Sequence, residues 1–452
     1  MFKSVTLLGL LIGSALAEDR PLTFYPSVLF EHHSQGSIYT LHPESSSLFE
    51  IGLRAEINRG PLQIDGQFLF TSAKNLNHKT TFFNPELNLE MNRSYFGNDQ
   101  TWFESSDLKM AYQQDSFEAY LGKMNPIWGQ GRSSLILSNN APSFFLGGFL
   151  WDITKKLRLE YFNGSISSQI VDTTSTPLYD NVGSRDRFYS RNIAAHRLTW
   201  RPFPTITFNA MELVIYGNRD IEKYYLLPFI PFWSTQRLIG DTDNVQMCGE
   251  IIWALNPTQH IYASLLIDEW RPEWTFNTKN RNWFGYQIGF LGKPIANFSG
   301  TIRMEYTWTD HRVYRHRFPI NDATSYQYSL GFWAGPHAEE VYLSYDSNIK
   351  EIKFLSSISW AKRGQLTQEM LENQYNNVTD ERYDGNVESR LHIQCVGKKL
   401  FLHNRIELSL GINYVDWVNA GFDPTAPEAL GNDVQKFSVN IGLSAMTDII
   451  FD

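Results

Sequence analysis

The sequence predicts an all-β protein, a transmembrane antiparallel β-barrel of 16–18 strands with 18 favoured. Polar and apolar residues alternate with a period of two along most of the chain. Nearly every such segment keeps one strictly polar face, so hydrocarbon rather than a second sheet is expected to cover the apolar faces. Aromatic residues make up 15% of the chain, which suits the two aromatic girdles of membrane barrels.

The segment 297–309 illustrates this alternation. Its apolar side carries Phe298, Ile302, Met304, Tyr306 and Trp308, and its polar side carries Ser299, Thr301, Arg303, Glu305 and Thr307. Successive side chains point to opposite faces of a strand, so these two sets separate in space. One greasy face and one charged face fit a wall between lipid and a wet lumen.

The first residues have the pattern of a cleaved signal peptide. Lys3 precedes an apolar run over 5–15, and Ala15-Leu16-Ala17 is a small-x-small cleavage site. We therefore expect residues 1–17 to be the signal peptide and 18–452 to form one outer-membrane β-barrel. Mean hydropathy is −0.32 and no later segment is apolar over the length of a spanning helix, which excludes a helical membrane protein.

The alternating segments give an ordered set of strands. We expect them at 49–57, 62–70, 102–112, 117–123, 143–151, 157–163, 196–200, 205–216, 245–255, 260–267, 283–291, 297–309, 326–334, 341–345, 352–360, 387–395, 402–414 and 435–445. This set places two short turns, near 335 and 347, in succession, which breaks the up-and-down order. Either one strand is split or one is missing, and 24–30 is the candidate for a missing strand.

The connections alternate between short turns and long loops, and the long ones are expected on the outer face. They are 73–100, 125–142, 164–195, 217–244, 270–282, 309–325, 363–385 and 417–433. Leu366, Met370 and Leu371 predict a short surface helix in one of them, with a disordered polar loop as the alternative.

Charged residues on the polar faces are expected to line the lumen. They are Arg54, Glu56, Arg303, Glu305, Arg390, Arg405 and Glu407. Arg303 stands two residues from Glu305, and Arg405 two residues from Glu407, which suits ion pairing on the inner wall.

Charge and cysteine content exclude several classes of protein. The net charge of −9 and a pI of about 5.7 argue against a nucleic-acid partner. Cys248 and Cys395 lie on separate predicted strands, so a disulfide-rich scaffold is excluded and their pairing is left open. The sequence contains no His/Cys cluster with metal-ligand spacing, and we expect no metal centre and no cofactor.

The segment 122–145 carries the information about family. It contains Trp128-Gly129-Gln130-Gly131-Arg132, then Leu135, and then Ser138-Asn139-Asn140-Ala141-Pro142. This element resembles the Wzi capsule-assembly family of outer-membrane barrels. A second stretch, from Ala210 through Glu212 to Pro231, is similar to another region of that family.

The resemblance implies an 18-stranded barrel that binds capsular polysaccharide at the cell surface as a lectin and is not an enzyme. Family members close the lumen with helical elements, whereas no N-terminal helical bundle is visible here, so any plug is expected to come from loops such as 125–142. Gly129 and Gly131 permit sharp turns beside Trp128. Arg132 then reaches an anionic sugar or, in the alternative, pairs with an acidic group inside the barrel.

The leading hypothesis is a polysaccharide-binding barrel that assists assembly or attachment of capsule or exopolysaccharide. Aromatic rings stack on sugar faces, and Asn, Asp and Arg bind hydroxyl groups. The candidate contacts are Trp128, Arg132, Asn139, Asn140, Tyr224, Trp233, Trp270, Arg271 and Trp274, with Tyr225, Tyr314 and Arg315 as further loop residues. For each one, packing within a girdle or a loop is the alternative.

Two other functions are retained. A passive porin for sugars or anions requires an open lumen. An outer-membrane hydrolase is a remote alternative, because His32-His33-Ser34-Gln35-Gly36 is only faintly similar to the His-x-Ser element of outer-membrane phospholipases and has Gln35 where they have Asn.

The remaining partners follow from the barrel itself. We expect contact with outer-membrane lipid, a monomeric state, and recognition by the barrel insertion machinery. Phe451 is similar to the terminal aromatic signal of such barrels, although Asp452 follows it.

Overall fold

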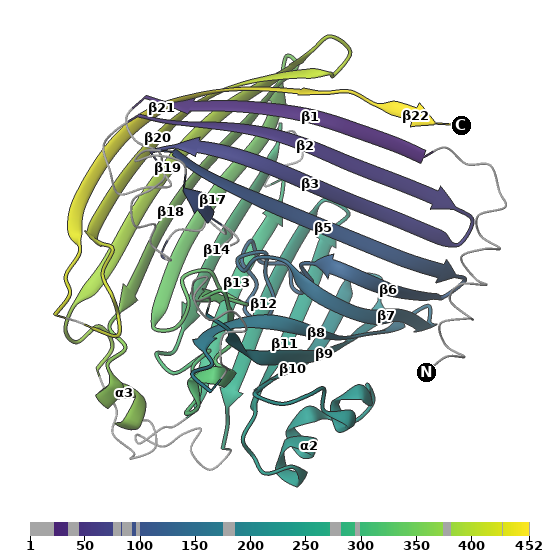
Figure 1. Cartoon of the computed structure of the whole chain (residues 1–452), viewed down its shortest axis with the longest axis vertical. Coiled ribbons are helices and arrows are strands. Elements are labelled where there is room, and N and C mark those ends of the chain that lie inside the picture. Colours follow the sequence, from purple (N-terminus) through teal and green to yellow (C-terminus); the bar gives the residue numbers. More distant parts are fainter. Residues whose placement is uncertain are drawn as a thin grey trace, which may run out of the picture.

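The computed structural model describes residues 22–34, 45–75, 83, 93–95, 100–174, 186–271, 282–293, 299–373, 381–426 and 428–451. Within this part, 18 antiparallel strands close into a barrel (Figure 1). The signal peptide predicted over 1–17 lies outside the described residues.

The barrel strands follow one another in chain order. They are β1 (Leu22–His33), β2 (Ser46–Arg59), β3 (Leu62–Lys74), β5 (Gln100–Gln114), β6 (Phe117–Met124), β7 (Phe144–Thr154), β8 (Leu157–Val171), β9 (Phe188–Phe203), β10 (Ile206–Gly217), β11 (Asn244–Asn256), β12 (Gln259–Glu269), β13 (Trp283–Gly292), β14 (Thr301–Thr309), β17 (Ala338–Ile349), β18 (Ile352–Gly364), β19 (Val387–Phe401), β20 (Ile406–Ala420) and β21 (Asn432–Met446).

Smaller elements complete the fold. They are β4 (Arg93–Tyr95), which pairs with β5; β22 (Ile449–Phe451); β15 (Thr324–Ser325) and β16 (Tyr328–Ser329), which pair with each other; the 3₁₀ helices η1 (Lys223–Leu226) and η3 (Pro319–Asn321); and the helices α2 (Phe232–Leu238) and α3 (Gln368–Asn373). No helix in the described part of the chain has the length and apolar character needed to cross a membrane. The helix predicted around Met370 is confirmed as α3.

Closure depends on β1, which pairs with β2 on one side and with β21 and β22 on the other. Leu22 faces Phe451 across this seam, so both ends of the described chain lie at the end with short turns (Figure 1). Outer-membrane barrels carry short periplasmic turns and long extracellular loops. We therefore call the end with the long connections the outer end.

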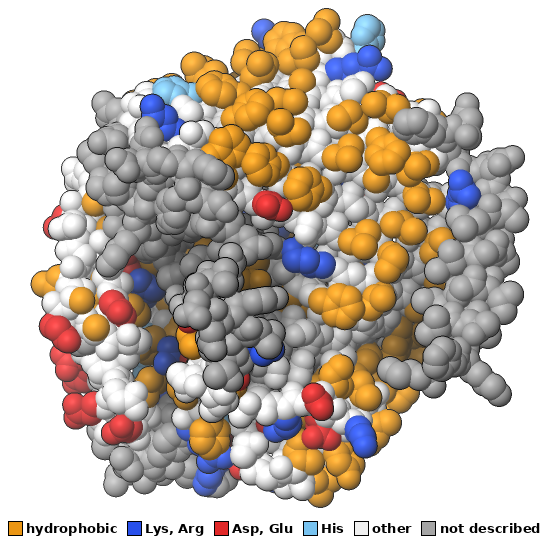
Figure 2. Space-filling model, viewed as in Figure 1, with side chains coloured by type: hydrophobic (Ala, Val, Ile, Leu, Met, Phe, Trp, Pro, Cys, Tyr) orange, Lys and Arg blue, Asp and Glu red, His pale blue; other side chains and the backbone are white. Residues whose placement is uncertain are grey.

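The lipid-facing side is a continuous apolar surface. Exposed Phe49, Ile51 and Leu53 alternate along β2 with inward-facing Glu50 and Arg54, and the other strands repeat this pattern. Figure 2 shows these apolar side chains spread over the wall, whereas acidic side chains gather toward the outer end. The two cysteines lie on opposite sides of the wall: Cys248 is buried in the lumen and Cys395 is exposed outside, so they do not pair.

One candidate strand is confirmed and one strand prediction is corrected. The segment 24–30 is indeed a strand, within β1, so the barrel begins before Phe49. The segment 326–334 is not a barrel strand, because it folds inside the lumen around β15 and β16. Its alternating apolar residues, such as Tyr328, Leu330 and Phe332, serve a core that surrounds them on all sides. With these changes the short and long connections alternate throughout.

The connection between β10 and β11 was expected as an outer loop but folds down outside the barrel (Figure 1). Residues 219–243, here called the lateral flap, pack on β8 to β11 through a buried cluster that includes Tyr161, Val214 and Phe232. On β10, Leu213 and Ile215 belong to the lumen core while Val214 belongs to this second cluster. Because side chains alternate across a strand, the flap lies on the lipid-facing side.

A charge on the lipid face is predicted to destabilise the barrel. Ile412→Arg, near the middle of β20, should lower the free energy of unfolding by about 2–4 kcal/mol, because it places a guanidinium in hydrocarbon. Tryptophan fluorescence during denaturant unfolding from lipid vesicles measures this change. Gln394→Arg, on the luminal side of the neighbouring β19, is the matched control and should change it little; equal losses would argue against the assigned faces.

Candidate functional site

The motif segment 125–143 runs into the lumen and forms the first half of a plug. Trp128 donates its backbone N–H to the carbonyl of Leu137 at 3.0 Å, which closes the segment into a loop. Gly129 has a φ of +123°, and a Cβ at Gly131 would lie 2.1 Å from Oε1 of Gln287. Both glycines are therefore required by geometry. The prediction that 125–142 plugs the barrel is confirmed.

The second half of the plug is the segment 310–337, which sequence reasoning divided between a loop and a strand. The Tyr314 hydroxyl donates to the carbonyl of Leu135 at 2.5 Å, and Ser138 Oγ donates to the carbonyl of Gly331 at 2.6 Å. The backbone N–H of Trp333 donates to Ser133 Oγ at 2.8 Å. These contacts join the two segments into one unit.

The centre of this plug is an apolar core. Leu135, Ile136 and Phe332 are at most 1% exposed, and Trp128 is 3% exposed. Trp128 packs edge-on against Phe162 of β8, with ring centroids 5.4 Å apart. The lumen at this level is therefore filled by packed side chains rather than by a polar passage.

Three carboxylates of the wall hold the first segment of the plug. Glu250 accepts the backbone N–H of Gln130 at 2.8 Å, and Glu305 accepts that of Arg132 at 2.9 Å. Glu340 receives the Arg132 guanidinium at 2.6 Å. A buried N–H without an acceptor costs free energy, because it has given up its hydrogen bond to water. These carboxylates supply the acceptors, and the contacts therefore fix the backbone of the motif.

Glu340 is the most enclosed of these carboxylates. Its side chain is 1% exposed, and it also accepts Trp333 Nε1–H at 2.8 Å and Ser359 Oγ–H at 2.6 Å. The Arg132 guanidinium stacks 4.3 Å above the ring of Tyr342. Arg132 thus forms the ion pair inside the barrel that the sequence analysis gave as one of its two alternatives.

The predicted lumen charges occupy three different settings. Arg303 donates to the carbonyl of Gln130 at 2.7 Å beside Glu305, so this pair supports the plug. Arg54 pairs with Glu56 and Asp65, in the half of the lumen nearer the short turns. Arg390, 1% exposed, stacks over Trp417.

The expected pairing of Arg405 with Glu407 is corrected. Arg405 lies in the turn before β20 and pairs with Asp448 at 3.5 Å. Glu407 pairs instead with Lys398 of β19 at 2.9 Å. The reason is that the strand begins at Ile406, so Arg405 belongs to the rim of the barrel and not to its inner wall.

The predicted sugar contacts are not brought together. Trp128 and Asn140 are buried in the plug, where Asn140 donates to the carbonyl of Ser329 at 3.1 Å, while Asn139 is exposed. Tyr224 and Trp233 lie on the lateral flap. Trp270 and Arg271 are exposed where β12 ends at the outer end, and Trp274 lies outside the described residues. Among the further loop residues, Tyr225 and Tyr314 are buried and Arg315 pairs with Asp322.

A polar cavity of about 340 Å³ lies beneath the plug on the inner wall. Its lining includes Arg158, Glu160, Arg197, Arg201 and His260, none of which the sequence analysis selected. Arg197 pairs with Glu160 at 2.6 Å, and its guanidinium lies 5.3 Å from the centre of the Trp128 ring. Arg158 and Glu160 on the predicted strand 157–163, with Arg197 on 196–200, were the signal that could have identified this wall.

A metal centre or a hydrolytic site would require other groups among the described residues. No group of three or more His, Cys, Asp or Glu side chains there has an arrangement that holds a metal ion. Of the residues in the phospholipase-like element, His33 meets Glu31 at 3.0 Å and Ser34 Oγ accepts the backbone N–H of Val439 at 3.1 Å. Gln35 and Gly36 lie outside the described residues.

No protein-family model and no characterised sequence matches this chain. Among solved structures it is similar to Wzi of Escherichia coli, described as a carbohydrate-binding β-barrel of the outer membrane involved in group 1 capsule assembly. The TM-score is 0.58 at 11% identity, over 96% of this chain and 86% of that one. The chain has the outer-membrane β-barrel fold.

Two outer-membrane proteins of Pseudomonas aeruginosa also match. OpdK, solved with vanillate, has a TM-score of 0.49 at 9% identity, over 95% of this chain and 99% of that one. OpdQ has a TM-score of 0.48 at 9% identity, over 96% of this chain and 100% of that one. At such identities all three similarities concern the fold alone.

Arg132→Ala is predicted to loosen the plug, because it leaves the enclosed Glu340 carboxylate without its guanidinium. We expect the free energy of unfolding to fall by about 1–3 kcal/mol, less than for a fully buried pair because Arg132 is partly exposed. Planar-bilayer recordings should show ion currents that the parent protein lacks.

Arg54→Ala is the control for this experiment, because it breaks an exposed pair of the wall away from the plug. It should remain electrically silent. Equal currents from the two variants, or silence from Arg132→Ala, would contradict the role given to Arg132.

His337, at the end of the plug, is predicted to make stability depend on pH. Burial lowers the pKa of His337 to about 4. Its Nδ1 meets the carbonyl of Gln365 at 2.8 Å and its Nε2 accepts the backbone N–H of Tyr383 at 3.2 Å, so the neutral ring with Nδ1–H fits this site. As pH falls, the unfolded chain protonates this histidine before the folded chain does. The neutral ring therefore contributes to the free energy of unfolding above about pH 6.5, and that contribution is lost as pH falls toward 4.

The comparison of the parent protein with His337→Gln isolates this contribution. Burial raises the pKa of Asp322 to about 6, which acts in the opposite direction over part of the same range and is common to both proteins. The stability difference between the two should shrink by about 1–3 kcal/mol between pH 7 and pH 4. His403→Gln, in an exposed turn, should show no such change.

Proposed function

We propose that this barrel binds surface polysaccharide and assists the assembly or attachment of capsule or exopolysaccharide, without catalysing a reaction. The observation that carries the proposal is the apolar core inside the lumen, formed by 125–143 and 310–337. A diffusion channel needs a water-filled path, which such a core opposes. The similarity in fold to Wzi supports the same proposal.

The outer end near β12 is the surface that we assign to the polymer. Trp270 is 50% exposed and is followed by the exposed Arg271. Arg237 and Arg317 lie within electrostatic range of Glu269, as Arg271 does, so cationic groups gather at this edge. A ring beside guanidinium groups suits an acidic polysaccharide, because the ring stacks on the sugar and the cations meet its carboxylates.

Export and insertion complete the proposal. A signal peptide over 1–17 would direct the chain out of the cytoplasm, and Phe451 at the seam would be read by the barrel insertion machinery. The continuous apolar wall would then be covered by outer-membrane lipid around a single barrel.

A passive porin for sugars or anions is the second candidate. The observation that favours it is the polar cavity beneath the plug, with Arg158, Arg197 and Arg201 on its wall. If the plug moved aside, these guanidinium groups would line a path for anions. Steady currents from the unmodified protein in a planar bilayer would favour this function over the lectin.

The double variant Trp270→Ala/Arg271→Ala is predicted to weaken polymer binding by about tenfold, since it removes one stacking contact and one cation. Labelled capsular polysaccharide is added to cells that carry each protein, and the bound label is measured.

Trp200→Ala, which removes an exposed ring from the lipid-facing wall, is the matched control and should bind like the parent protein. Cells without the protein should bind as little as background. Equal binding by cells with and without the protein would refute the proposed function.

A further inference from the structure

The lateral flap is fastened to the lipid-facing wall by a polar latch. Glu212 of β10 accepts the backbone N–H of Phe232 at 2.8 Å and that of Trp233 at 2.9 Å. His196 of β9 meets the same carboxylate at 2.9 Å, and its ring stacks on Phe232 with centroids 4.4 Å apart. A carboxylate that points toward lipid is costly, so the flap has a defined seat on the wall.

The other side of the flap is apolar and exposed. Phe229 is 66% exposed and Leu238 is 77% exposed, and Leu226, Leu227, Ile230 and Trp233 are each between 41% and 47% exposed. A short amphipathic segment of this kind lies in the membrane interface with its apolar face among the acyl chains. The flap therefore sits in the outer leaflet, beside the barrel wall.

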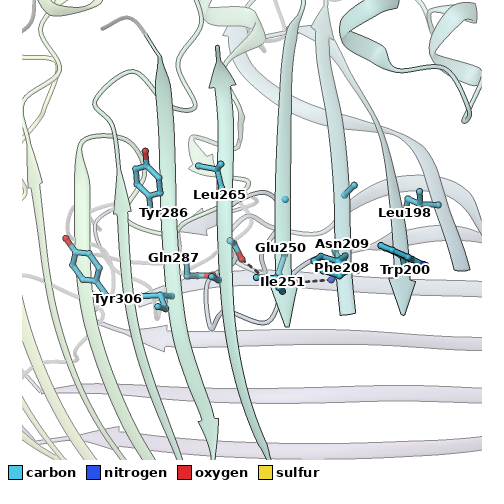
Figure 3. A pocket seen from close by; sticks show the side chains of 15 residues that line it. Leu198, Trp200, Phe208, Asn209, Glu250, Ile251, Leu265, Tyr286, Gln287 and Tyr306 are labelled. Atoms are coloured by element: carbon cyan, nitrogen blue, oxygen red, sulfur yellow. Dashed lines mark hydrogen bonds between the residues drawn. The ribbon is translucent and has the colours of Figure 1, made fainter. Parts of the chain in front are cut away.

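An apolar groove begins directly below the latch. The outward positions next to His196 and Glu212 are Leu198 and Ala210, and both line a groove of about 820 Å³ (Figure 3). Its floor is low because Ala210, Gly249 and Ala263 are small. A Cβ added to Gly249 would meet no atom within 4 Å.

Large side chains form the sides of this groove. Trp200 and Phe208 stand at one end, while Tyr286 and Tyr306 stand at the other (Figure 3). The strand register aligns them: Ala210 pairs with Gly249, Gly249 with Leu265, and Leu265 with Tyr286. The groove thus crosses several strands of the lipid-facing wall, and it begins one outward position from the latch that fastens the flap.

Cationic groups lie where this part of the wall meets the outer end. Arg237 belongs to the flap and stacks 5.6 Å from the centre of the Trp233 ring. Arg317 donates to the backbone carbonyl of Asp241 at the base of the flap. Both are within electrostatic range of Glu269, the last residue of β12.

We propose that the groove and the lateral flap bind one acyl chain of an outer-leaflet lipid whose phosphorylated headgroup meets Arg237 and Arg317. The groove faces hydrocarbon, its exposed lining is apolar, and the nearby cations complement a phosphate. A second barrel is a poorer occupant, because the flap projects from the wall beside the groove and would hold a convex surface away. The groove is separate from Trp270 and Arg271 of the surface assigned to the polymer, whereas Arg237 and Arg317 border both.

Retention of lipid by the purified barrel tests this site. The folded protein is extracted in mild detergent, supplied with dimyristoyl phosphatidylglycerol, and examined by native mass spectrometry. We expect one firmly retained lipid per barrel. Gly249→Phe should lower its retention by about tenfold, because the ring occupies the floor and removes a few methylene contacts.

Matched variants make the result decisive. Ala445→Phe adds the same ring at an outward position of β21, away from the groove, and should retain the lipid. If Gly249→Phe folds poorly, as judged by heat-modifiable migration, Ala263→Phe takes its place and should lower lipid retention to the same degree. Arg237→Gln/Arg317→Gln should reduce retention of phosphatidylglycerol to that of phosphatidylcholine, and inorganic phosphate should not compete.

Equal retention by the parent protein, Gly249→Phe and Ala445→Phe would overturn the proposal, since it would show only the lipid that surrounds any barrel. A dimer that dissociates on Gly249→Phe would overturn it as well, because a second copy would then be the occupant. Polysaccharide binding by Gly249→Phe is measured in parallel, so loss of the lipid site is distinguished from failure of the polymer site.

Discussion

The whole architecture depends on satisfying every backbone hydrogen bond within a hydrocarbon layer. Water is absent there, so an unpaired strand edge is excluded and the sheet has to close on itself. The pairing of β1 with β2 on one side and with β21 and β22 on the other achieves this closure. Once the ladder is closed, the alternation of side chains sends every second residue into an enclosed lumen.

The lumen must then hold either packed side chains or water, and in this chain each occupies a different level. Near the short turns its walls carry solvated ion pairs such as Arg54 with Asp65. Toward the outer end, two long connections fold inward and form an apolar core fixed by Glu250, Glu305 and Glu340. The plug therefore resembles the interior of a soluble protein, bounded by a polar wall with which it exchanges hydrogen bonds.

Sequence reasoning recovered what depends on local alternation. The strands, their number and the inward course of 125–142 follow from period-two patterns and from the glycines of the motif. It left β1 as a candidate, inferred from the break in the up-and-down order. Pro26 of this strand lacks an N–H, but the partner strand is interrupted there, between Met446 and Ile449, so no ladder bond is lost.

The errors share one physical origin. Alternation reports that a segment has an apolar side, but it does not report what covers that side. The same pattern at 326–334 serves a core inside the lumen, and the apolar run 224–233 covers the barrel from outside. Glu212 and His196, ionisable residues at outward positions of predicted strands, were signs in the sequence that something other than lipid covers the wall.

This outward carboxylate also constrains how the protein is made. Before the flap is seated, Glu212 and His196 would stand bare on the surface that enters the membrane, where charge is strongly disfavoured. The β10–β11 connection has to cross to the far side of the bilayer and still cover these two side chains. Biogenesis therefore favours an order in which β9, β10 and the flap assemble as one unit before this part of the wall meets lipid.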